Sequence, residues 1–360
     1  MKLPKGFLVS GVHCGIKKKK LDLGLIYAQE LCGVVGIFTV NANPAYSVTF
    51  CKENINKPIK AILVNSGNAN CYSHRQGLTD TREIASKLAK KLGVKRTNIL
   101  IASTGIIGKK LPKAKIIKGL SELEKKLGKS LNDFAQSILT TDNFIKVSAA
   151  KVGAATIIGF AKGAGMIYPN MATMLGFILT DADIPRGLLK KIAKEAVDPS
   201  FNSISIDGCM STNDTVLVAT SRKIPIKNKG ELKIFSQQLK SVCLNLAKMI
   251  VKDGEGASKF IQIEITGAKS LAEAKSAGMS LANSNLFKAA IYGAKANWGR
   301  IIASLGQAGI KVSENIVIKT TSLKGKEVKI TIDLKRGKAR GKIYTCDLSP
   351  EYVKINAEYS

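Results

Sequence analysis

The sequence predicts a layered α/β fold, and three observations support this class. In the first third of the chain, short apolar runs alternate with loops rich in Gly and Asn, and a helical segment separates two of these runs. This alternation is typical of sheets that pack against helices. A chain of 360 residues also exceeds one ordinary core. Because the pattern changes after about residue 270, we expect a core over residues 1–270 and a smaller C-terminal α+β lobe over residues 271–360.

Apolar runs and helical spacing locate the elements of the expected core. Runs of β-branched and other apolar residues predict strands, whereas apolar residues three and four positions apart predict helices. Gly93 marks the end of the first helix, and Asp183 is expected to cap a helix that has Pro185 in its first turn. The expected strands cover residues 34–40, 61–64, 98–102, 151–160, 173–179, 203–208, 215–220 and 259–265, and the expected helices cover 79–92, 130–140, 183–197 and 231–251.

The smaller lobe is expected to begin with helices and to end with strands. Helical spacing follows Gly267 and continues in SNLFKAAIYG at 284–293 and NWGRIIASLG at 297–306. Alternating apolar residues then predict strands at 316–320, 327–333 and 342–346.

The charge of the chain is unusual. The sequence has 56 Lys and Arg against 26 Asp and Glu, a formal net charge of +30, and its lysine run at 17–20 is suited to phosphate contacts. Lysines outnumber arginines, however, and no aromatic and arginine stacking motif accompanies them. We therefore expect no nucleic-acid partner and interpret the charge as a source of solubility and of attraction for acidic metabolites. A basic nucleic-acid-binding protein is the alternative from a different class.

The sequence also predicts a cytoplasmic protein without a membrane segment. Residues 1–7 lack an apolar signal segment, and the uncharged run 163–180 contains three glycines, Pro169 and Asn170, which favour a buried loop and strand over a membrane helix. Seven scattered cysteines without a CxxC pair argue against a disulfide framework and a zinc site. We expect reduced, mostly buried thiols.

Histidine chemistry is disfavoured because the chain has two histidines, His13 and His74, and neither lies in a nucleophile motif. Phosphate loops are disfavoured as well, since GIIGKK at 105–110 and GFAKGAG at 159–165 lack the required spacing. The remaining possibility is a hydroxyl nucleophile whose general base is not a histidine. A threonine can do this when its own α-amine is the base, because that amine has a pKa of about 7.7–8.0 against about 10.4 for lysine.

Thr173 is a candidate for this role, provided that the chain is cut directly before it. The preceding residue, Ala172, is small, and Pro169 and Asn170 favour a kinked approach to the bond. From these residues alone, an ordinary threonine at the start of a strand is the competing interpretation.

The segment KGAGMIYPNMATMLGFILTDADI at 162–184 resembles the signature of the glutamate N-acetyltransferases, also called ornithine acetyltransferases, of arginine biosynthesis. The resemblance extends over essentially the whole chain in the family order. Further matching blocks lie at residues 4–17, 61–71, 102–112, 138–144, 200–216, 253–260, 284–301 and 352–359.

The resemblance implies a core like that of the N-terminal-nucleophile hydrolases and a precursor that cleaves itself between Ala172 and Thr173. The fragments 1–172 and 173–360 would stay together as a heterotetramer of two α and two β fragments. The implied reaction moves the acetyl group from N2-acetylornithine to glutamate through an acetyl-threonine intermediate, without a cofactor. Acetyl-CoA is a possible co-substrate, which the sequence does not decide. An N-terminal-nucleophile amidase or aminopeptidase, which passes the acyl group to water, is the alternative enzyme.

The resemblance also implies roles for individual residues beside the nucleophile Thr173. The implied residues are Thr104 and Gly105 as the oxyanion-hole pair, Lys162 for the substrate α-carboxylate, Glu255 for the ornithine ammonium, one of Thr140 and Thr141, and Asn356. Family chains usually run one residue further than this one, so the terminal hydroxyl contact falls to Ser360, shifted by one position, or is vacant.

Overall fold

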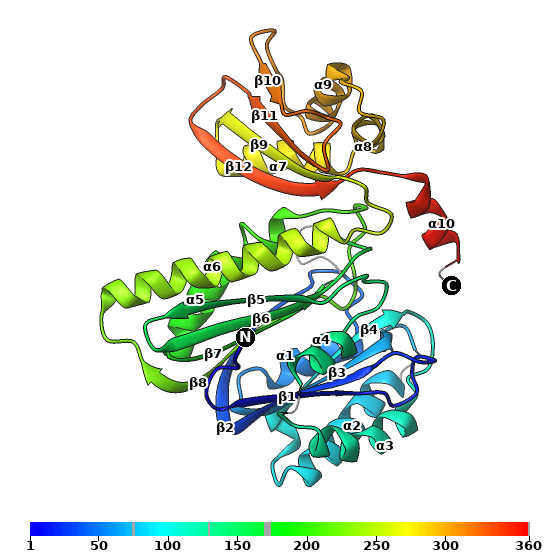
Figure 1. Cartoon of the computed structure of the whole chain (residues 1–360), viewed down its shortest axis with the longest axis vertical. Coiled ribbons are helices and arrows are strands. Elements are labelled where there is room, and N and C mark those ends of the chain that lie inside the picture. The colour runs from blue at the N-terminus through cyan, green and yellow to red at the C-terminus, as the bar shows by residue number, and fades with distance from the viewer. Residues whose placement is uncertain (74–75, 129, 169–173, 359–360) are drawn as a thin grey trace. The chain divides into compact units, whose positions relative to one another are not determined.

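The computed structural model describes residues 1–73, 76–128, 130–168 and 174–358, and these form two compact units. Unit 1 holds the described residues among Met1–Gly163, Thr173–Val197 and Ser211–Leu246, and unit 2 holds those among Ala164–Ala172, Asp198–Met210 and Ala247–Ser360. Each unit contains one β-sheet with helices packed against it (Figure 1). The predicted α/β class is therefore confirmed. The lobe expected from residue 271 lies in unit 2, while the domain boundary after residue 270 stays a prediction.

Unit 1 is organised around the long strand β2 (Leu23–Phe38), whose two halves pair with different neighbours. Its first half pairs with β1 and β3 and its second half with β8. Among the described residues the sheet has eight strands in the order β4-β3-β2-β8-β7-β6-β5, with β1 beside β2. The β3–β4 and β7–β8 pairs are parallel. The other strands are β1 (Phe7–Val12), β3 (Ile59–Asn68), β4 (Ile99–Ile106), β5 (Lys146–Val152), β6 (Ala155–Lys162), β7 (Leu175–Asp183) and β8 (Thr215–Pro225).

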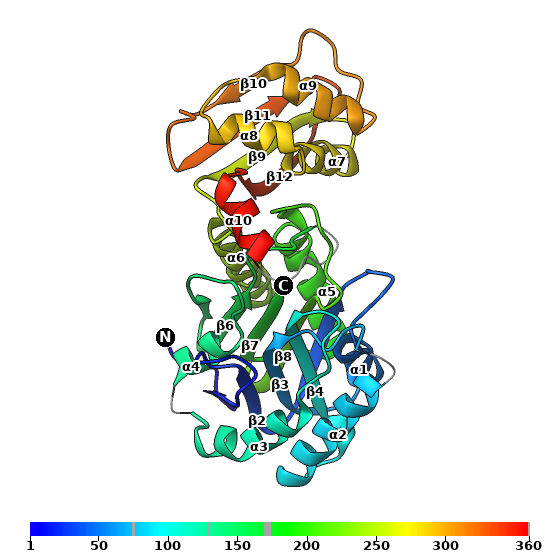
Figure 2. The same cartoon turned by 90° about the vertical axis from the view of Figure 1, so that its right-hand side faces the viewer.

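Helices cover both faces of the first half of this sheet. In β3, Ala61 and Leu63 enter the core beneath α2 and α3, whereas Ile62 and Val64 enter the core that contains α4 (Figures 1 and 2). Alternate residues of a strand face opposite sides, so this apolar run is buried on both of its faces. The helices of unit 1 are α1 (Tyr46–Asn54), α2 (Gln76–Lys91), α3 (Lys113–Lys125), α4 (Leu131–Ser137), α5 (Arg186–Val197) and α6 (Lys229–Lys252), whose residues from Ala247 belong to unit 2, and a 3₁₀ turn, η1, covers Arg96–Asn98.

Helix α4 joins the two halves of the unit 1 sheet through one aromatic side chain. The Phe134 ring contacts Phe160 of β6 and Phe177 of β7, with ring centroids 5.1 and 5.9 Å apart. On its other side α4 lies so close to β1 that a Cβ on Gly11 would be 2.1 Å from the carbonyl oxygen of Asp133. Only a glycine permits this approach of helix to strand.

Unit 2 is a sheet with three helices on one face (Figures 1 and 2). Among the described residues it has four strands in the order β10-β11-β9-β12, with β9 parallel to β11 and antiparallel to β12. The alternation predicted for 327–333 is confirmed, since Val328, Ile330 and Ile332 all enter the core. The elements are β9 (Phe260–Ala268), α7 (Leu271–Ala282), α8 (Asn285–Tyr292), α9 (Trp298–Gln307), β10 (Val317–Thr320), β11 (Glu327–Asp333), β12 (Ala339–Cys346), α10 (Pro350–Glu358) and the 3₁₀ turn η2 (Phe201–Ser203).

Two strand predictions are wrong. The strand expected at 151–160 is a hairpin, because the chain turns at Gly153, which has φ +55°, between β5 and β6. Residues 203–208 contribute a single bridge, from Ile204 to Tyr344, instead of a strand. Here Asp207 accepts hydrogen bonds from backbone N–H groups, and such bonds compete with strand pairing.

The predicted cap at Asp183 is also wrong. Asp183 is the last residue of β7, and α5 begins at Arg186. Helical geometry is disfavoured for a residue that precedes a proline, so Ile184 cannot start the helix. Strand β7 therefore continues to Asp183, the residue before Ile184. The strand predicted from residue 173 is confirmed from Leu175 onward, whereas Thr173 lies outside the described residues.

All seven cysteines lie in the described residues and none forms a disulfide there. Of the described helices, none is long and apolar enough to cross a membrane. Within the same residues, no group of three or more His, Cys, Asp and Glu is placed to hold a metal ion.

Candidate active site

Two of the predicted site residues meet in unit 1, at the ends of β4 and β6. The Lys162 Nζ lies 3.2 Å from the Thr104 Oγ1, and both residues are 3% exposed. An ammonium group has hydrogens to donate and no acceptor site, so Thr104 accepts this hydrogen bond. The hydrogen of the Thr104 hydroxyl must therefore point to another acceptor. This is the orientation that a donor to a developing oxyanion requires.

Gly105 follows Thr104 in a conformation that requires a glycine. Its φ is +131°, and a Cβ at this position would lie 2.4 Å from the carbonyl carbon of Gly67 and 2.5 Å from the Asn68 nitrogen. The β3 and β4 backbones thus approach each other closely where both strands end. Asn68 fixes the following loop by donating to the carbonyl oxygens of Lys109 and Lys110, at 3.1 Å each.

The predicted pair Thr140 and Thr141 lies next to a buried carboxylate that the sequence reasoning missed, Asp142. Its Oδ1 accepts from the Lys146 Nζ at 2.7 Å and from the Gly163 N–H at 2.6 Å. Its Oδ2 accepts from the Thr140 N–H at 3.0 Å. Asp142 therefore links the backbone of Thr140 to that of Gly163, the residue that follows Lys162. Which of the two threonines binds substrate stays a prediction.

Burial alone would raise the pKa of Asp142, but the ammonium groups of Lys162 and Lys146 and the Gly163 N–H outweigh it. The pKa of this carboxyl is consequently held below its ordinary value. The carboxyl is ionised at neutral pH and supplies the negative charge that the two buried lysines need.

Replacing Asp142 with asparagine is expected to lower the free energy of unfolding by about 3–5 kcal/mol, because the Lys146 ammonium, 0% exposed, loses its charged partner. The folded-state pKa of Asp142 is below the unfolded value, so its stabilisation is present above about pH 4 and is lost as the pH falls through the folded-state pKa. Urea unfolding of the wild-type protein and of Asp142→Asn, at pH 7 and in acid, measures this effect. The difference between their free energies of unfolding should shrink in acid.

The control for this experiment is Asp183→Asn, which removes an exposed ion pair with Arg222. Such a pair contributes about 1 kcal/mol or less. An equal loss of stability in both variants would contradict the assigned role of Asp142.

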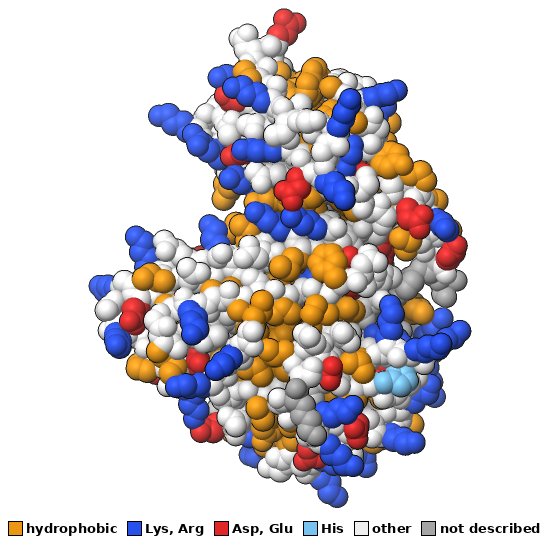
Figure 3. All heavy atoms as spheres, viewed as in Figure 1, with side chains coloured by type: hydrophobic (Ala, Val, Ile, Leu, Met, Phe, Trp, Pro, Cys, Tyr) orange, Lys and Arg blue, Asp and Glu red, His pale blue; other side chains and the backbone are white. Residues whose placement is uncertain are grey.

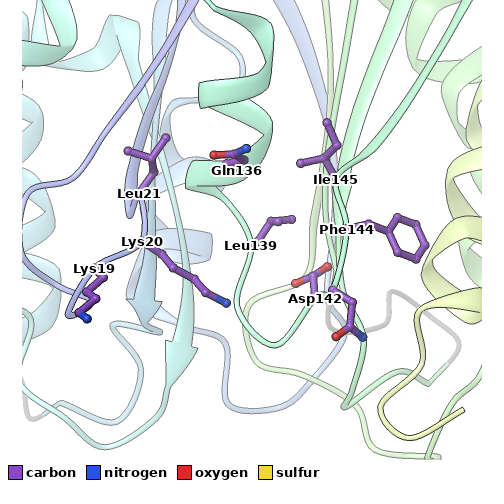
Figure 4. A pocket seen from close by; sticks show the side chains of 9 residues that line it. Lys19, Lys20, Leu21, Gln136, Leu139, Asp142, Phe144 and Ile145 are labelled. Carbon is purple, nitrogen blue, oxygen red and sulfur yellow. The ribbon is translucent and has the colours of Figure 1, made fainter.

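A hollow of about 560 Å³ shares Asp142 with this cluster (Figure 4). Figure 4 shows the Lys20 side chain extending from the loop between β1 and β2 toward the side on which Asp142 lies. Beside it, the Lys17 Nζ donates to the Leu139 carbonyl oxygen at 2.9 Å, and burial lowers the pKa of Lys17 to about 8. The hollow thus combines cationic and apolar walls. Its lining residues are Lys19, Lys20, Leu21, Gln136, Leu139, Asp142, Asn143, Phe144 and Ile145.

Asp214, directly before β8, is a second buried carboxylate that the sequence reasoning missed. Its Oδ1 accepts from the Met174 N–H at 3.1 Å. Burial raises the pKa of Asp214 well above its ordinary value, although the Met174 N–H, Lys162 and the Ser211 hydroxyl act in the opposite direction. Both acidic residues lie in blocks that match the family, at 138–144 and 200–216, and this is the signal that could have found them.

Two further predicted residues meet in unit 2. The Asn356 Nδ2 on α10 lies 3.0 Å from the Glu255 Oε2. Glu255 lies in the turn after α6, and its N–H donates to the Ala164 carbonyl oxygen at 2.8 Å. A Cβ on Gly165 would lie 2.3 Å from the same Oε2, so Gly165 leaves room for the carboxylate in this position. Glu255 is half-buried with one amide neighbour, and its carboxylate is suited to bind an ammonium group.

Asp207 holds the segment of unit 2 that leads toward the predicted cleavage bond. Its carboxylate accepts from the N–H groups of Met166 and Ile167 at 2.5 and 2.9 Å. Met166 has a φ of +57°, which is uncommon for a residue other than glycine. The predicted residues Ala172, Thr173 and Ser360 themselves lie outside the described residues, so the cleavage bond and the terminal contact stay predictions.

Comparisons with known proteins relate the whole chain to one family. The ArgJ family model matches residues 8–321 and 317–360. A relative called arginine biosynthesis bifunctional protein ArgJ, from Caldanaerobacter subterraneus subsp. tengcongensis, is 40% identical over 394 residues, which cover 100% of this chain and 98% of the relative. The protein of the same name from Thermotoga neapolitana is 40% identical over 396 residues, with 100% of both chains covered. Among solved structures, ornithine acetyltransferase from Mycobacterium tuberculosis, complexed with ornithine, has 31% identity and a TM-score of 0.43, covering 46% of this chain and 92% of that chain.

Proposed function

The chain belongs to the ArgJ family, and we propose that it is the acetyltransferase of arginine biosynthesis that moves the acetyl group of N2-acetylornithine to glutamate. The observation that carries this proposal is the match, over the whole chain, to relatives named for arginine biosynthesis at 40% identity. The contact between Thr104 and Lys162 in unit 1 supports it, because that contact orients a hydroxyl as acyl transfer requires.

The proposed reaction uses Thr173 after cleavage of the bond to Ala172. The free amine of Thr173 takes the hydroxyl proton while the oxygen attacks the acetyl carbonyl carbon of acetylornithine. The carbon–nitrogen bond then breaks, ornithine leaves with that proton on its nitrogen, and the acetyl group remains as a threonine ester. The amine of glutamate attacks this ester, and the threonine hydroxyl is restored. Two half-reactions through a covalent intermediate give ping-pong kinetics.

Each of the remaining predicted residues would either stabilise the oxyanion or bind the substrate. The Thr104 hydroxyl and the Gly105 N–H would donate to the oxygen that becomes negative in each tetrahedral intermediate. Lys162 would attract the α-carboxylate that acetylornithine and glutamate share, and Glu255 would bind the ornithine ammonium. Thr140 or Thr141, Asn356 and Ser360 would complete the substrate contacts.

The proposal includes the assembly and the compartment. Cleavage would give a heterotetramer of two α and two β fragments in the cytoplasm, with no cofactor. On the face that Figure 3 shows, Lys and Arg side chains are spread over both units instead of gathered in one patch. A dispersed positive charge of this kind raises the local concentration of acidic substrates such as glutamate.

Acetylornithine incubated with the purified protein, with and without glutamate, tests the proposed function. We expect ornithine to be released only when glutamate is present, with acetylglutamate formed in equal amount. Equal ornithine release without glutamate would favour the amidase or aminopeptidase alternative. An uncleaved chain that is retained on DNA with a steep salt dependence would favour the nucleic-acid-binding alternative.

Acetyl-CoA is a second acetyl donor that the lysine-lined hollow supports, since its phosphates require cationic partners and its pantetheine arm tolerates apolar walls. Lys20→Glu is expected to raise the KM for acetyl-CoA about tenfold and to leave the KM for acetylornithine within twofold, because the reversed charge repels phosphate.

The matched control is Lys18→Glu. Lys18 is exposed in the same lysine run and does not line the hollow, so the control makes the same change of net charge. Steady-state kinetics with both donors measures the effect. The same rise of KM in both variants would show that the hollow is not the site.

A further inference from the structure

Lys17 is a half-buried lysine to which the proposed mechanism gives no role. Its Nζ donates to the Leu139 carbonyl oxygen at 2.9 Å. Among the described residues, this ammonium makes no second hydrogen bond and no ion pair. An ammonium group has three N–H donors, so two of them remain for a further acceptor.

Three hydrogen bonds to one buried carboxylate fix the backbone that carries Lys17. Asp22, 0% exposed, accepts from the N–H groups of Cys14, Gly15 and Lys17, at 2.6, 3.2 and 2.9 Å. Both of its oxygens are therefore occupied by backbone donors. Asp22 acts on the Lys17 ammonium through its charge and leaves the two remaining N–H groups of Lys17 available.

The side chain of Lys17 lies beside the proposed oxyanion-hole pair. A Cβ on Gly67 would lie 3.1 Å from the Lys17 Cγ and 3.8 Å from its Cδ, so the methylene chain of Lys17 passes over Gly67. Gly67 of β3 pairs with Gly105 of β4, where a Cβ on Gly105 would lie 2.4 Å from the Gly67 carbonyl carbon. The ammonium at the end of this chain meets Leu139, directly before the predicted substrate residue Thr140.

The Lys17 ammonium is also near the ammonium that is expected to bind substrate. The charges of Lys162 and Asp142 are near enough to act on Lys17. Lys162 donates to the Thr104 Oγ1 at 3.2 Å. Two cations, one from the loop between β1 and β2 and one from the end of β6, therefore lie close to the hydroxyl that would face the oxyanion.

We propose that Lys17 binds the side-chain carboxylate of the acetyl acceptor, glutamate, while Lys162 binds its α-carboxylate. This inference rests on the proposed function. Acetylornithine has one carboxylate and a cationic side chain, whereas glutamate has two carboxylates. A second ammonium beside the first therefore suits the acceptor and not the donor, and its contact with a carboxylate is a charge-assisted hydrogen bond. Lys17 acts in the second half-reaction alone.

Lys17→Met tests this proposal in the full chain. Methionine keeps an unbranched side chain over Gly67 and removes the ammonium. The matched control is Lys115→Met, since the exposed Lys115 Nζ donates to the Gly15 carbonyl oxygen of the same loop at 2.7 Å. This control removes an ammonium that also holds a backbone carbonyl but does not lie beside Gly67.

Isotope exchange separates the two half-reactions of a ping-pong enzyme. Labelled ornithine enters acetylornithine through the first half-reaction, and labelled glutamate enters acetylglutamate through the second. For Lys17→Met we expect kcat/KM for glutamate exchange to fall about 10–100-fold and ornithine exchange to stay within about twofold, because only glutamate loses a charge-assisted hydrogen bond. Lys17→Arg should restore most of the glutamate exchange, and Lys115→Met should leave both exchange reactions unchanged.

Glutamine as acceptor gives a readout that a structural role of Lys17 would not change. Glutamine has the shape of glutamate without the side-chain charge, so the wild-type protein should prefer glutamate. In Lys17→Met we expect this preference, measured as a ratio of kcat/KM values, to fall about 10–100-fold.

An unchanged preference for glutamate over glutamine in Lys17→Met would overturn the proposal. An equal fall of both exchange reactions would overturn it as well, because the oxyanion is common to both half-reactions. So would an equal loss of glutamate exchange in Lys115→Met.

The wild-type protein separates this proposal from the proposed function. If it exchanges no label between glutamate and acetylglutamate, the proposed function fails and the role of Lys17 fails with it. If wild-type exchange is present, the results for Lys17→Met decide the role of Lys17 alone.

Discussion

Replacing Thr173 with alanine is expected to leave a single uncut chain of 360 residues that transfers no acetyl group. The hydroxyl is the group that would attack the preceding carbonyl during cleavage and the acetyl carbonyl during transfer, so alanine removes both reactions. The rate should fall to the background, which is a loss of at least about 10⁴-fold when a covalent nucleophile is deleted. Intact-mass analysis and the acetylornithine assay measure the two effects separately.

Two controls make the Thr173→Ala result specific. Thr173→Ser retains a hydroxyl and should still form two fragments. Thr180→Ala removes a buried hydroxyl from β7, one that donates to the Thr156 carbonyl oxygen at 2.9 Å, and should cost about 1 kcal/mol of stability without affecting cleavage. The same two fragments from Thr173→Ala would show that the nucleophile is assigned to the wrong residue.

Replacing Thr104 with valine is expected to lower kcat about 10²–10³-fold with little change of KM. Valine keeps the shape of threonine but removes the hydroxyl hydrogen that the contact with Lys162 leaves free for another acceptor. Loss of one oxyanion donor raises the barrier by about 2.7–4 kcal/mol. Initial rates of ornithine release in the presence of glutamate, normalised to the amount of cleaved protein, measure this effect.

Thr104→Ser should restore most of the activity because it returns the hydroxyl. Ser103→Ala is the structural control. Ser103 precedes Thr104 on β4, and its buried Oγ donates to the Asn65 Oδ1 of β3 at 2.7 Å. That variant should lose stability and keep its kcat. If Thr104→Val kept the wild-type kcat, the oxyanion role of this hydroxyl would be wrong.

Strands with strong apolar runs could be predicted from the sequence, because a strand that is buried on both faces is apolar at successive positions. The run at 61–64 is an example, since it is buried on both sides of β3. Where the apolar pattern continues through a turn, prediction failed. Val152 before Gly153 and Ala154 after it are both apolar, so nothing in the periodicity separates β5 from β6. Helix α3 was missed although its buried Ile116, Leu120 and Leu123 are spaced as one face of a helix.

The candidate site was predictable where the family resemblance reached individual residues. Lys162 and Thr104 lie in apolar strand ends, and the resemblance singled them out before the structure placed them 3.2 Å apart. Asp142 and Asp214 lie in polar loops, where an acidic residue ordinarily faces water. Their burial depends on the lysines and backbone N–H groups that distant segments bring to them. Such partners follow from tertiary structure and not from local pattern.

Each of the two units contains residues from both sides of the bond before residue 173. In unit 1, β6 lies before the bond and pairs with β7, which lies after it. In unit 2, Met166 and Ile167 lie before the bond and donate to Asp207, which lies after it. A chain cut at this bond therefore completes each unit from two polypeptides.

Cleavage thus changes the molecularity of folding. The uncut precursor would fold by a first-order reaction, whereas the cut protein could regain the sheet of unit 1 only after its two fragments meet. Its unfolding midpoint in denaturant should rise with protein concentration, as in an obligate dimer. A precursor of this kind would have to fold before it is cut, because the sheet of unit 1 takes β1–β6 from one fragment and β7 and β8 from the other.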